Sequence, residues 1–413
     1  MGVGHCGGSG KVKSKGDKMA RIMVLSFRFP YPLTDGARIR IYNLCRILAQ
    51  KHAVDVVSLN EGDLLADSIQ NVKSMLNALH VFSFPPICFK LNALKGLLSR
   101  DPLQAHYYYF PKVQRWINHH FLQYDIIFCF HIRMTRYLRN ITTVRQVLDF
   151  IDATSINYRE AQNLARGIWR CVLPVENRRL LSYEIRMLES FNKAFITSNY
   201  DKSYLEQHAG RKFENLVVIP NGVREDLFSR PPAKHEEDWI VFLGKMNYAP
   251  NVDAVSYFVT KVFSHIHAQL PNIRFLIVGT SPAKEVLKLA RFPSVFVTGY
   301  VEDPYEYLEK AKIVVAPLRF SAGIQNKILE AMALRKAVVT TTKGARGIGG
   351  KDGEHFLVAD EPEDMAGKIL KLLGNQNLRK EIGENARKLV ETTYRWDIIG
   401  QKLLAEIDQV LNQ

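Results

Sequence analysis

Apolar runs without alternation recur along the chain and are separated by segments of helical periodicity. Near the N-terminus, RIMVLSF (21–27) and AVDVVSL (53–59) predict strands on either side of a helix at 37–50. The apolar residues Ile39, Leu44, Ile47 and Leu48 recur in that helix at helical spacing. Strands that are apolar throughout are typical of parallel sheets covered on both faces, so the pattern predicts a βαβ unit.

The same pattern continues through the first half. Strands are predicted at 124–131, 145–155 and 193–199. The region 68–120 is less regular. Its helix within 84–102 carries leucines beside Lys90, Lys95 and Arg100, which suits either an anionic bilayer or an ordinary half-buried helix. The aromatic run at 106–116 suits either a hydrophobic acceptor groove or the core.

The second half repeats this logic after the turn signal at 220–222. Strand, loop and helix follow one another from 238 to 270, and further strands are predicted at 273–280 and 295–303. A helix at 304–311 precedes a buried strand at 313–318. The chain is therefore predicted to contain two doubly wound α/β units.

The segment from 313 to 341 is the strongest candidate for a binding site. Its buried strand leads through a loop at 319–325 into an amphipathic helix at 326–334, and another buried strand follows at 337–341. Unpaired N–H groups at a helix N-terminus favour anions, and Arg319 and Lys327 add positive charge. Glu330, one turn into the helix, is placed to accept hydrogen bonds from sugar hydroxyls. The pattern predicts a nucleotide-diphosphate site.

Loops at the carboxyl ends of the first-half strands supply the opposite candidates, because ligands bind at that edge of open α/β sheets. The loop at 30–38 is either exposed to a cleft, where Gly36 allows close approach and Arg38 and Arg40 reach an anion, or an ordinary surface loop. His131 and Asp152 end two strands predicted to be neighbours. They suit a base, an acid or an orienting group, although a lone histidine is often only structural.

The chain of 413 residues has a net charge of +15, which is unevenly distributed. Residues 20–219 contain 26 basic and 16 acidic side chains, whereas residues 220–413 contain 26 and 24. A basic first half indicates an anionic partner, such as a membrane surface, a phosphorylated acceptor or nucleic acid, or merely a basic surface. No nucleic-acid-binding signature is present, so nucleic acid is not expected.

Further sequence features narrow the class of protein. The five cysteines form no CxxC or Cys/His cluster, which favours a reduced, cytoplasmic environment without structural zinc. No apolar run of about 18 or more residues predicts a membrane span. Residues 1–18 are rich in Gly, Ser and Lys and are expected to be disordered, without a secretory signal.

Together these segments resemble the GT-B glycosyltransferases, and more narrowly the retaining family-4 sugar transferases associated with exopolysaccharide synthesis. The resemblance covers about residues 20–410. It is carried by GIQNKILEAMALRKAVVTT, FLGKMNYAPNVDAV, VIPNGV and LDFIDATS. It implies two doubly wound Rossmann-like domains that face each other across a cleft, with the nucleotide-sugar donor on the second and the acceptor on the first.

The expected domain limits follow. An N-terminal extension (1–19) precedes an acceptor-binding domain (20–219) and a nucleotide-sugar-binding domain (220–395). A C-terminal helix (396–413) is expected to pack back on the first domain.

The resemblance also implies roles for individual residues. Glu330 matches the glutamate that holds the donor ribose. The loop under the diphosphate and sugar corresponds to Gly323, Ile324, Gln325, Asn326 and Lys327. Lys245 matches a basic residue that neutralises the diphosphate, and Gly36 a glycine near the donor phosphates. Tyr300 and Val301 match the segment that meets the base, and His131 an active-site histidine.

Two departures from the family pattern affect the expected chemistry. Ala322 stands where a first glutamate is usual, and Asn251 stands near a usual lysine. Arg319 and Lys327 are candidates for the missing cation. The expected catalytic set is His131, Lys245, Arg319 and Asp152. No DxD pair or ligand cluster predicts a metal, and no cofactor is expected beyond the nucleotide sugar as substrate.

The predicted function is therefore a retaining transfer of sugar from a UDP- or GDP-linked donor to a glycan, lipid-linked or other hydroxyl acceptor. A cytoplasmic location, with peripheral contact to the inner face of an anionic plasma membrane, is expected. The alternatives are a nucleotide-sugar epimerase on the same fold, and a catalytically silent donor-binding subunit of a polysaccharide assembly complex. The second alternative is motivated by Ala322.

Overall fold

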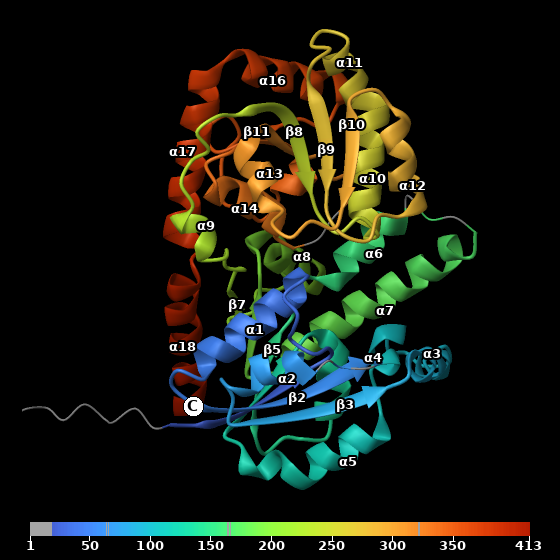
Figure 1. The fold of residues 1–413 in the computed structure, drawn as a ribbon. Coiled ribbons are helices and arrows are strands. Elements are labelled where there is room, and N and C mark those ends of the chain that lie inside the picture. Colours follow the sequence, from blue (N-terminus) through green and yellow to red (C-terminus); the bar gives the residue numbers. More distant parts are fainter. Residues whose placement is uncertain (1–18, 63, 65, 163–164, 166, 321–322) are drawn as a thin grey trace, which may run out of the picture.

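The computed structural model describes residues 19–413, apart from residues 63, 65, 163, 164, 166, 321 and 322. The expected disorder of residues 1–18 and the departure at Ala322 lie outside this part of the chain. Two lobes are visible in Figure 1, and each is built around one parallel sheet covered by helices. This arrangement confirms the predicted α/β class, with two doubly wound Rossmann-like units.

The lower lobe in Figure 1 contains a seven-stranded sheet of order β3-β2-β1-β4-β5-β6-β7. Every pair that the structure describes in it is parallel. Its strands are β1 (Arg21–Ser26), β2 (Ala53–Glu61), β3 (Ala78–Phe84), β4 (Ile126–Phe130), β5 (Arg145–Asp149), β6 (Lys193–Ile196) and β7 (Leu216–Val218). β3 was not predicted. Its residues are only half-buried at the sheet edge, so it lacks the fully apolar pattern of the central strands.

The helices of this lobe connect successive strands. They are α1 (Gly36–Leu48), α2 (Ala66–Lys73), α3 (Pro86–Lys95), α4 (Leu103–Tyr107), α5 (Pro111–His120), α6 (Thr154–Gln162), α7 (Trp169–Ser190) and α8 (Asn199–Ala209), with 3₁₀ turns η1 (Phe121–Gln123) and η2 (Ile132–Leu138). The strand predicted at 145–155 was too long, because β5 ends at Asp149 and α6 begins at Thr154. Asp152 therefore lies in the connecting turn.

The upper lobe contains a six-stranded parallel sheet of order β10-β9-β8-β11-β12-β13. Its strands are β8 (Glu237–Leu243), β9 (Arg274–Val278), β10 (Val295–Gly299), β11 (Ala311–Ala316), β12 (Ala337–Thr340) and β13 (Leu357–Val358). Its helices are α9 (Asp226–Ser229), α10 (Ala249–Tyr257), η3 (Phe258–Phe263), α11 (Ser264–His267), α12 (Lys284–Leu287), η4 (Lys288–Arg291), α13 (Tyr305–Lys310), α14 (Asn326–Ala333), α15 (Thr342–Ala345), α16 (Pro362–Gly374) and α17 (Gln376–Thr393).

The last helix, α18 (Trp396–Asn412), leaves the upper lobe and packs along the lower one (Figure 1). Its buried residues Trp396, Ile399, Leu403, Ile407 and Val410 belong to the hydrophobic core of the first sheet. The chain thus passes twice between the lobes. The two passages lie side by side, since the Val223 N–H donates to the Tyr394 carbonyl oxygen at 2.8 Å.

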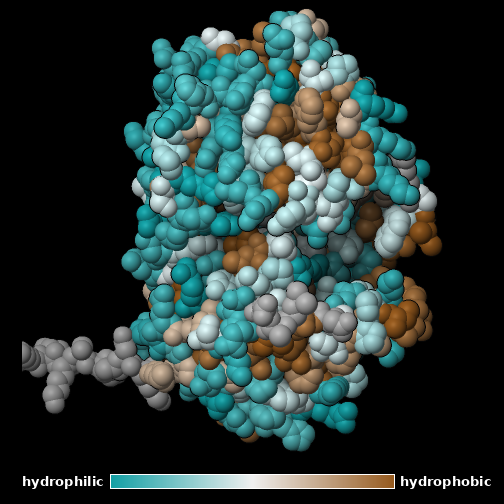
Figure 2. Space-filling model, viewed as in Figure 1, coloured by the Kyte–Doolittle hydropathy of each residue, from teal (hydrophilic) through white to brown (hydrophobic). Residues whose placement is uncertain are grey.

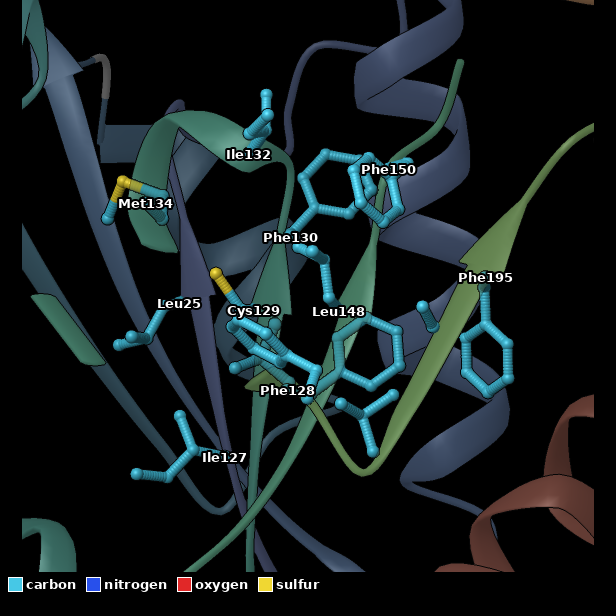
Figure 3. Packing of buried hydrophobic residues seen from close by; sticks show 14 of the residues in the cluster. Leu25, Ile127, Phe128, Cys129, Phe130, Ile132, Met134, Leu148, Phe150 and Phe195 are labelled. Carbon is cyan, nitrogen blue, oxygen red and sulfur yellow. The ribbon is translucent and has the colours of Figure 1, made fainter. Parts of the chain in front are cut away.

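The centre of the first sheet is closely packed beneath the carboxyl ends of its strands. Figure 3 shows Phe128 and Phe130 of β4 packed among side chains of the neighbouring strands, including Leu148 of β5 and Phe195 of β6. All of these side chains are fully buried. Burial of each large apolar side chain contributes about 1.5–3 kcal/mol. The loops that follow β4 and β5 therefore start from a fixed base.

Candidate functional site

Two helix N-termini, one from each lobe, meet between the sheets. Gly36 is the first residue of α1, and Asn326 is the first residue of α14. A Cβ atom on Gly36 would lie 3.1 Å from the Asn326 side-chain nitrogen. The unpaired N–H groups of both helices are thus close together, and both dipoles favour negative charge at this place. The geometry suits a phosphate group with partners on both lobes.

A buried arginine holds this junction together. Arg40, which has no exposed surface, donates two hydrogen bonds to Asp149 at 2.7 and 3.1 Å and two to the Pro220 carbonyl and the Asn221 side-chain oxygen, both at 3.0 Å. The Asn221 amide in turn donates to the Asn326 side-chain oxygen at 3.2 Å. Arg40 therefore links α1, β5, the segment between the lobes and α14. The prediction that Arg40 reaches an anion was wrong, because Asp149 and Asn221 already enclose its guanidinium.

Lys327 lies beside this junction in a largely apolar setting. Its ammonium donates to the Asn251 side-chain oxygen at 2.8 Å and lies 5.2 Å from the centre of the Phe242 ring. Burial lowers the pKa of Lys327 to about 8, although Glu330 opposes that shift. The Asn251 amide also donates to the Lys245 carbonyl at 2.9 Å, so it joins the two lysine-bearing segments. The Lys327 ammonium is thus held next to Asn251.

Glu330 faces a different group of side chains. The Tyr305 hydroxyl is hydrogen-bonded to the Glu330 carboxylate, and Arg224 is near enough to stabilise its charge. Burial, the largest effect, nevertheless raises the pKa of Glu330. Arg224 lies over the Tyr305 ring, 5.3 Å from its centre, and pairs with Asp226. A half-buried carboxylate held in this way presents acceptor oxygens in a fixed orientation.

His131 follows β4 and has an unusual backbone conformation. It is buried, and its φ of 76° places it in the left-handed region. Its Nδ1 accepts a hydrogen bond from the Arg133 N–H at 3.3 Å. Burial, with the nearby charges of Arg133 and Arg28, holds the pKa of His131 well below its usual range. The neutral ring therefore carries its proton on Nε2, which makes it a hydrogen-bond donor rather than a base.

Asp152 lies opposite the loop that precedes α14. A Cβ atom on Gly323 would come within 3.2 Å of the Asp152 Cβ and 3.3 Å of its carboxyl oxygen. Gly323 has a φ of +66°, so glycine is favoured there both by conformation and by this approach. Burial and the neighbouring Asp201 raise the pKa of Asp152 to about 7. Besides burial, the charge of Asp152 also acts to raise the pKa of Tyr248, which belongs to the upper lobe. Asp152 thus borders the space between the lobes.

Other predicted residues are placed less centrally. Arg319 is exposed and pairs with Asp253, with its guanidinium 5.0 Å from the centre of the Tyr257 ring. Residues two apart on a helix do not share a face, so Asp253 and Asn251 lie on different sides of α10. Arg319 and Lys327 thus have different partners on α10.

The remaining predicted residues lie around the same helix terminus or beyond it. Ile324 is buried in the core of the upper lobe, and Gln325 caps α14. Lys245 is exposed in the loop after β8. Tyr300, which is 76% exposed, and the half-buried Val301 follow β10. Ala322 lies outside the described residues.

Two further observations concern the whole described chain. Among the described residues, no group of three or more His, Cys, Asp or Glu side chains could hold a metal ion. Within the same part of the chain, no helix combines the length and apolar character needed to cross a membrane.

Comparison with known proteins identifies the class of protein to which this chain belongs. Family models match both halves: one for glycosyltransferase family 4 covers residues 34–227, and one for group 1 glycosyl transferases covers residues 237–375. In fold, the chain is similar to sucrose-phosphate synthase from Thermosynechococcus elongatus, with a TM-score of 0.70 and 17% identity over 95% of this chain and 99% of that one. The fold and site thus define a glycosyltransferase of the GT-B type. The chain belongs to the group 1 glycosyltransferases.

Some relatives of similar sequence have names that refer to a cps region, to capsular polysaccharide or to lipopolysaccharide. A 44.6 kDa protein in the cps region of Klebsiella pneumoniae is 22% identical over 91% of this chain and 97% of its own. The capsular polysaccharide glycosyltransferase CapM of Staphylococcus aureus is 26% identical over 53% of this chain and 59% of its own. The lipopolysaccharide 1,2-N-acetylglucosaminetransferase of Salmonella typhimurium is 22% identical over 73% and 83%.

Proposed function

We propose that this enzyme transfers a sugar from a nucleoside-diphosphate sugar, UDP- or GDP-linked, to a hydroxyl group of a glycan or lipid-linked acceptor, with retention of configuration. The observation that carries the proposal is the approach of Gly36 to Asn326, since it brings two helix N-termini to one place. A diphosphate group has negative charge enough to interact with both helix N-termini at once. HepE of Anabaena, whose structures contain UDP and UDP-glucose, is similar in fold at a TM-score of 0.61, 16% identity and 94% and 100% coverage.

The reaction would use these residues as follows. The acceptor oxygen forms a bond to the anomeric carbon on the face from which the diphosphate leaves. The electron pair of the broken bond stays on the diphosphate, whose oxygen takes the acceptor proton. Lys327 and the helix N-termini stabilise the charge that develops on the leaving group, and Lys245 is placed to add to this effect. His131, as a neutral donor, and Asp152 orient sugar and acceptor hydroxyls.

Binding and transfer test the proposal separately. Calorimetry with UDP, GDP and ADP would identify the nucleotide, and a labelled donor of that nucleotide would then report transfer or hydrolysis. NMR of the anomeric proton in the product distinguishes retention from inversion. Release of an epimer without transfer would instead support an epimerase. Binding of none of the nucleotides would overturn the donor assignment.

We further propose that the lower lobe contacts an anionic membrane from its α3 side. Figure 2 shows apolar surface gathered over α3 and near the start of α7. The exposed apolar residues there are Ile87, Leu91, Leu94, Leu97, Leu98, Ile168 and Trp169. A hollow lined by Arg100, Arg178 and Arg179 separates the end of α3 from α7. Apolar side chains flanked by basic ones match the interface of an anionic bilayer.

Co-sedimentation with vesicles measures this contact. Wild-type protein is expected to pellet with phosphatidylglycerol vesicles and to remain in solution with phosphatidylcholine vesicles. Leu94→Asp combined with Leu98→Asp should abolish pelleting, because both leucines are exposed and their replacement leaves the core intact. Equal pelleting of the double variant would show that another surface makes the contact.

A further inference from the structure

Two arginines of the lower lobe converge on one aromatic ring. Arg28 follows β1, and its guanidinium carbon lies 4.5 Å from the centre of the Phe27 ring. Arg133, in η2, lies 4.7 Å from the same centre and 5.4 Å from that of Tyr108. Because both lie this close to one ring centre, the two guanidinium carbons are no more than about 9 Å apart. Since like charges repel, an anion that binds between the two groups would be favoured.

The charge of Arg133 is not neutralised within the described part of the chain. Its Nε donates to the neutral Gln104 side chain at 2.7 Å, and the Gln104 amide donates to the Tyr158 hydroxyl at 2.6 Å. No carboxylate among the described residues forms an ion pair with Arg133. Asp152 is nevertheless near enough that the charge of Arg133 acts to lower the pKa of Asp152. Among the described residues, Arg28 forms an ion pair with the partly exposed Asp35 at 3.2 Å, and Asp35 also pairs with Arg38. The pair therefore keeps an excess of positive charge.

Arg133 lies at the space between the lobes, on the side of the lower lobe, where the acceptor is expected. It lies two residues after His131, and Phe27 lies against the His131 ring with centres 5.1 Å apart. Tyr248, from the upper lobe, is affected by the charge of Arg133 as well as that of Asp152. The cations of the donor site described above, Lys327 and Lys245, belong to the other lobe. Arg28 and Arg133 thus form a separate positive site facing the same cleft.

An apolar path leads from this positive site to the surface. Tyr108, which Arg133 overlies, packs against Phe89 with ring centres 5.8 Å apart. Phe89 is the buried residue of α3, whose other face carries exposed leucines. The positive site and the proposed membrane-contacting helix are therefore joined through one aromatic cluster.

From this arrangement we propose that Arg28 and Arg133 bind a phosphate group of the acceptor, and that the acceptor is a lipid phosphate whose apolar tail leaves along α3. The inference rests on the proposed transferase function and names its acceptor class. Arginine suits the task because its planar guanidinium matches phosphate oxygens with two parallel hydrogen bonds. In the described part of the chain Arg133 donates through Nε to Gln104 and Arg28 through one terminal nitrogen to Asp35, which leaves their other N–H groups for these bonds.

The test uses octyl phosphate and octyl glucoside as matched probes, each added to the full chain already saturated with UDP. Saturation fills the donor phosphate site, so any further phosphate binding must occur elsewhere. Octyl phosphate should bind, whereas octyl glucoside should bind at least about tenfold more weakly, as expected for loss of charge-assisted hydrogen bonds. Arg133→Gln and Arg28→Gln should each weaken octyl phosphate binding about tenfold or more and leave UDP affinity within about twofold.

Arg211→Gln is the matched control. Arg211 also lies over an aromatic ring, that of Phe213, but it pairs with Glu189 and follows the far end of α8. Its replacement should leave both affinities unchanged. Inorganic phosphate that binds as tightly as octyl phosphate would support the phosphate site but assign it to a soluble acceptor.

Three results would overturn the proposal: equal affinity of wild type for the two octyl probes, unchanged phosphate affinity in both arginine variants, or loss of UDP binding in them. The last result would assign the arginines to the donor. Failure of wild type to bind UDP, GDP and ADP alike would instead contradict the proposed function itself, whereas binding of GDP or ADP alone would mean that the nucleotide that binds replaces UDP in this test. Unchanged UDP binding also shows that the variants are folded.

Discussion

Replacing Lys327 by methionine removes a charge that the fold stabilises poorly. The pKa of the buried ammonium falls from 10.5 to about 8, a shift equivalent to about 3 kcal/mol of lost stability at neutral pH. The variant leaves the Asn251 side-chain oxygen without its 2.8 Å partner, which costs about 1 kcal/mol. We therefore expect Lys327→Met to stabilise the free enzyme by about 2 kcal/mol while it weakens nucleotide-diphosphate binding.

The pH dependence follows from the same shift. Below pH 8 the folded and unfolded chains both carry the charge, so the burial penalty is complete. Between pH 8 and pH 10.5 only the unfolded chain holds the proton, and the stability of the wild type rises toward that of the variant. The variant should therefore be the more stable protein near neutral pH, and above about pH 10.5 the order should reverse, because only the lost hydrogen bond to Asn251, about 1 kcal/mol, then separates the two. Chemical denaturation of both proteins across this range measures the difference.

Ligand affinity should move in the opposite direction. If the diphosphate binds the ammonium form, the charged fraction falls about tenfold between pH 7 and pH 9, and UDP should bind about tenfold more weakly. Lys327→Arg keeps its charge throughout this range and should show a flat profile. Calorimetric titrations with UDP at pH 7, 8 and 9 decide the matter. A wild-type affinity that is independent of pH, or a Lys327→Met variant that binds UDP normally, would refute the reasoning.

Three further predictions concern neighbouring contacts. Glu330→Ala should weaken UDP binding about tenfold to a hundredfold in calorimetry, because hydrogen bonds to a charged group contribute about 1.5–3 kcal/mol, and normal affinity would remove Glu330 from the site. Arg40→Met should lower the free energy of unfolding by about 3–5 kcal/mol, because the buried Asp149 loses its partner. Adding Asp149→Leu should restore most of that stability in denaturant unfolding. A double variant no more stable than Arg40→Met alone would contradict this explanation. Gly222→Ala places a Cβ atom 2.4 Å from the Trp396 ring, so the thermal midpoint should fall and stay low unless Trp396 is also reduced in size.

Much of the framework could be predicted from the sequence because its signals are local. The helix expected at 326–334 is α14 (Asn326–Ala333), and the buried strand expected at 337–341 is β12 (Ala337–Thr340). Fully apolar runs identify central parallel strands wherever they occur. The edge strand β3 (Ala78–Phe84) escaped prediction because partial burial leaves a mixed pattern.

The site was predictable only where one segment supplied it. Glu330 and Lys327 share α14, so their proximity follows from helix geometry. Arg40 was assigned to an anion because nothing in its own segment shows Asp149, which lies 109 residues further along the chain. Arg319 was expected beside Lys327, yet Asp253 engages it elsewhere. Pairing between distant ions is set by the packing of the sheets, and local patterns do not contain it.

The return of α18 to the first sheet has a consequence for how the chain is made. The first lobe has residues from both ends of the sequence, and the second lobe is in effect an insertion within it. Domains generally fold in order as the chain emerges from the ribosome. Here the side of the first core that α18 covers stays open until α18 itself has been made. The second lobe can thus fold before the first lobe has its final helix, and loss of residues 396–413 would damage the lobe made first.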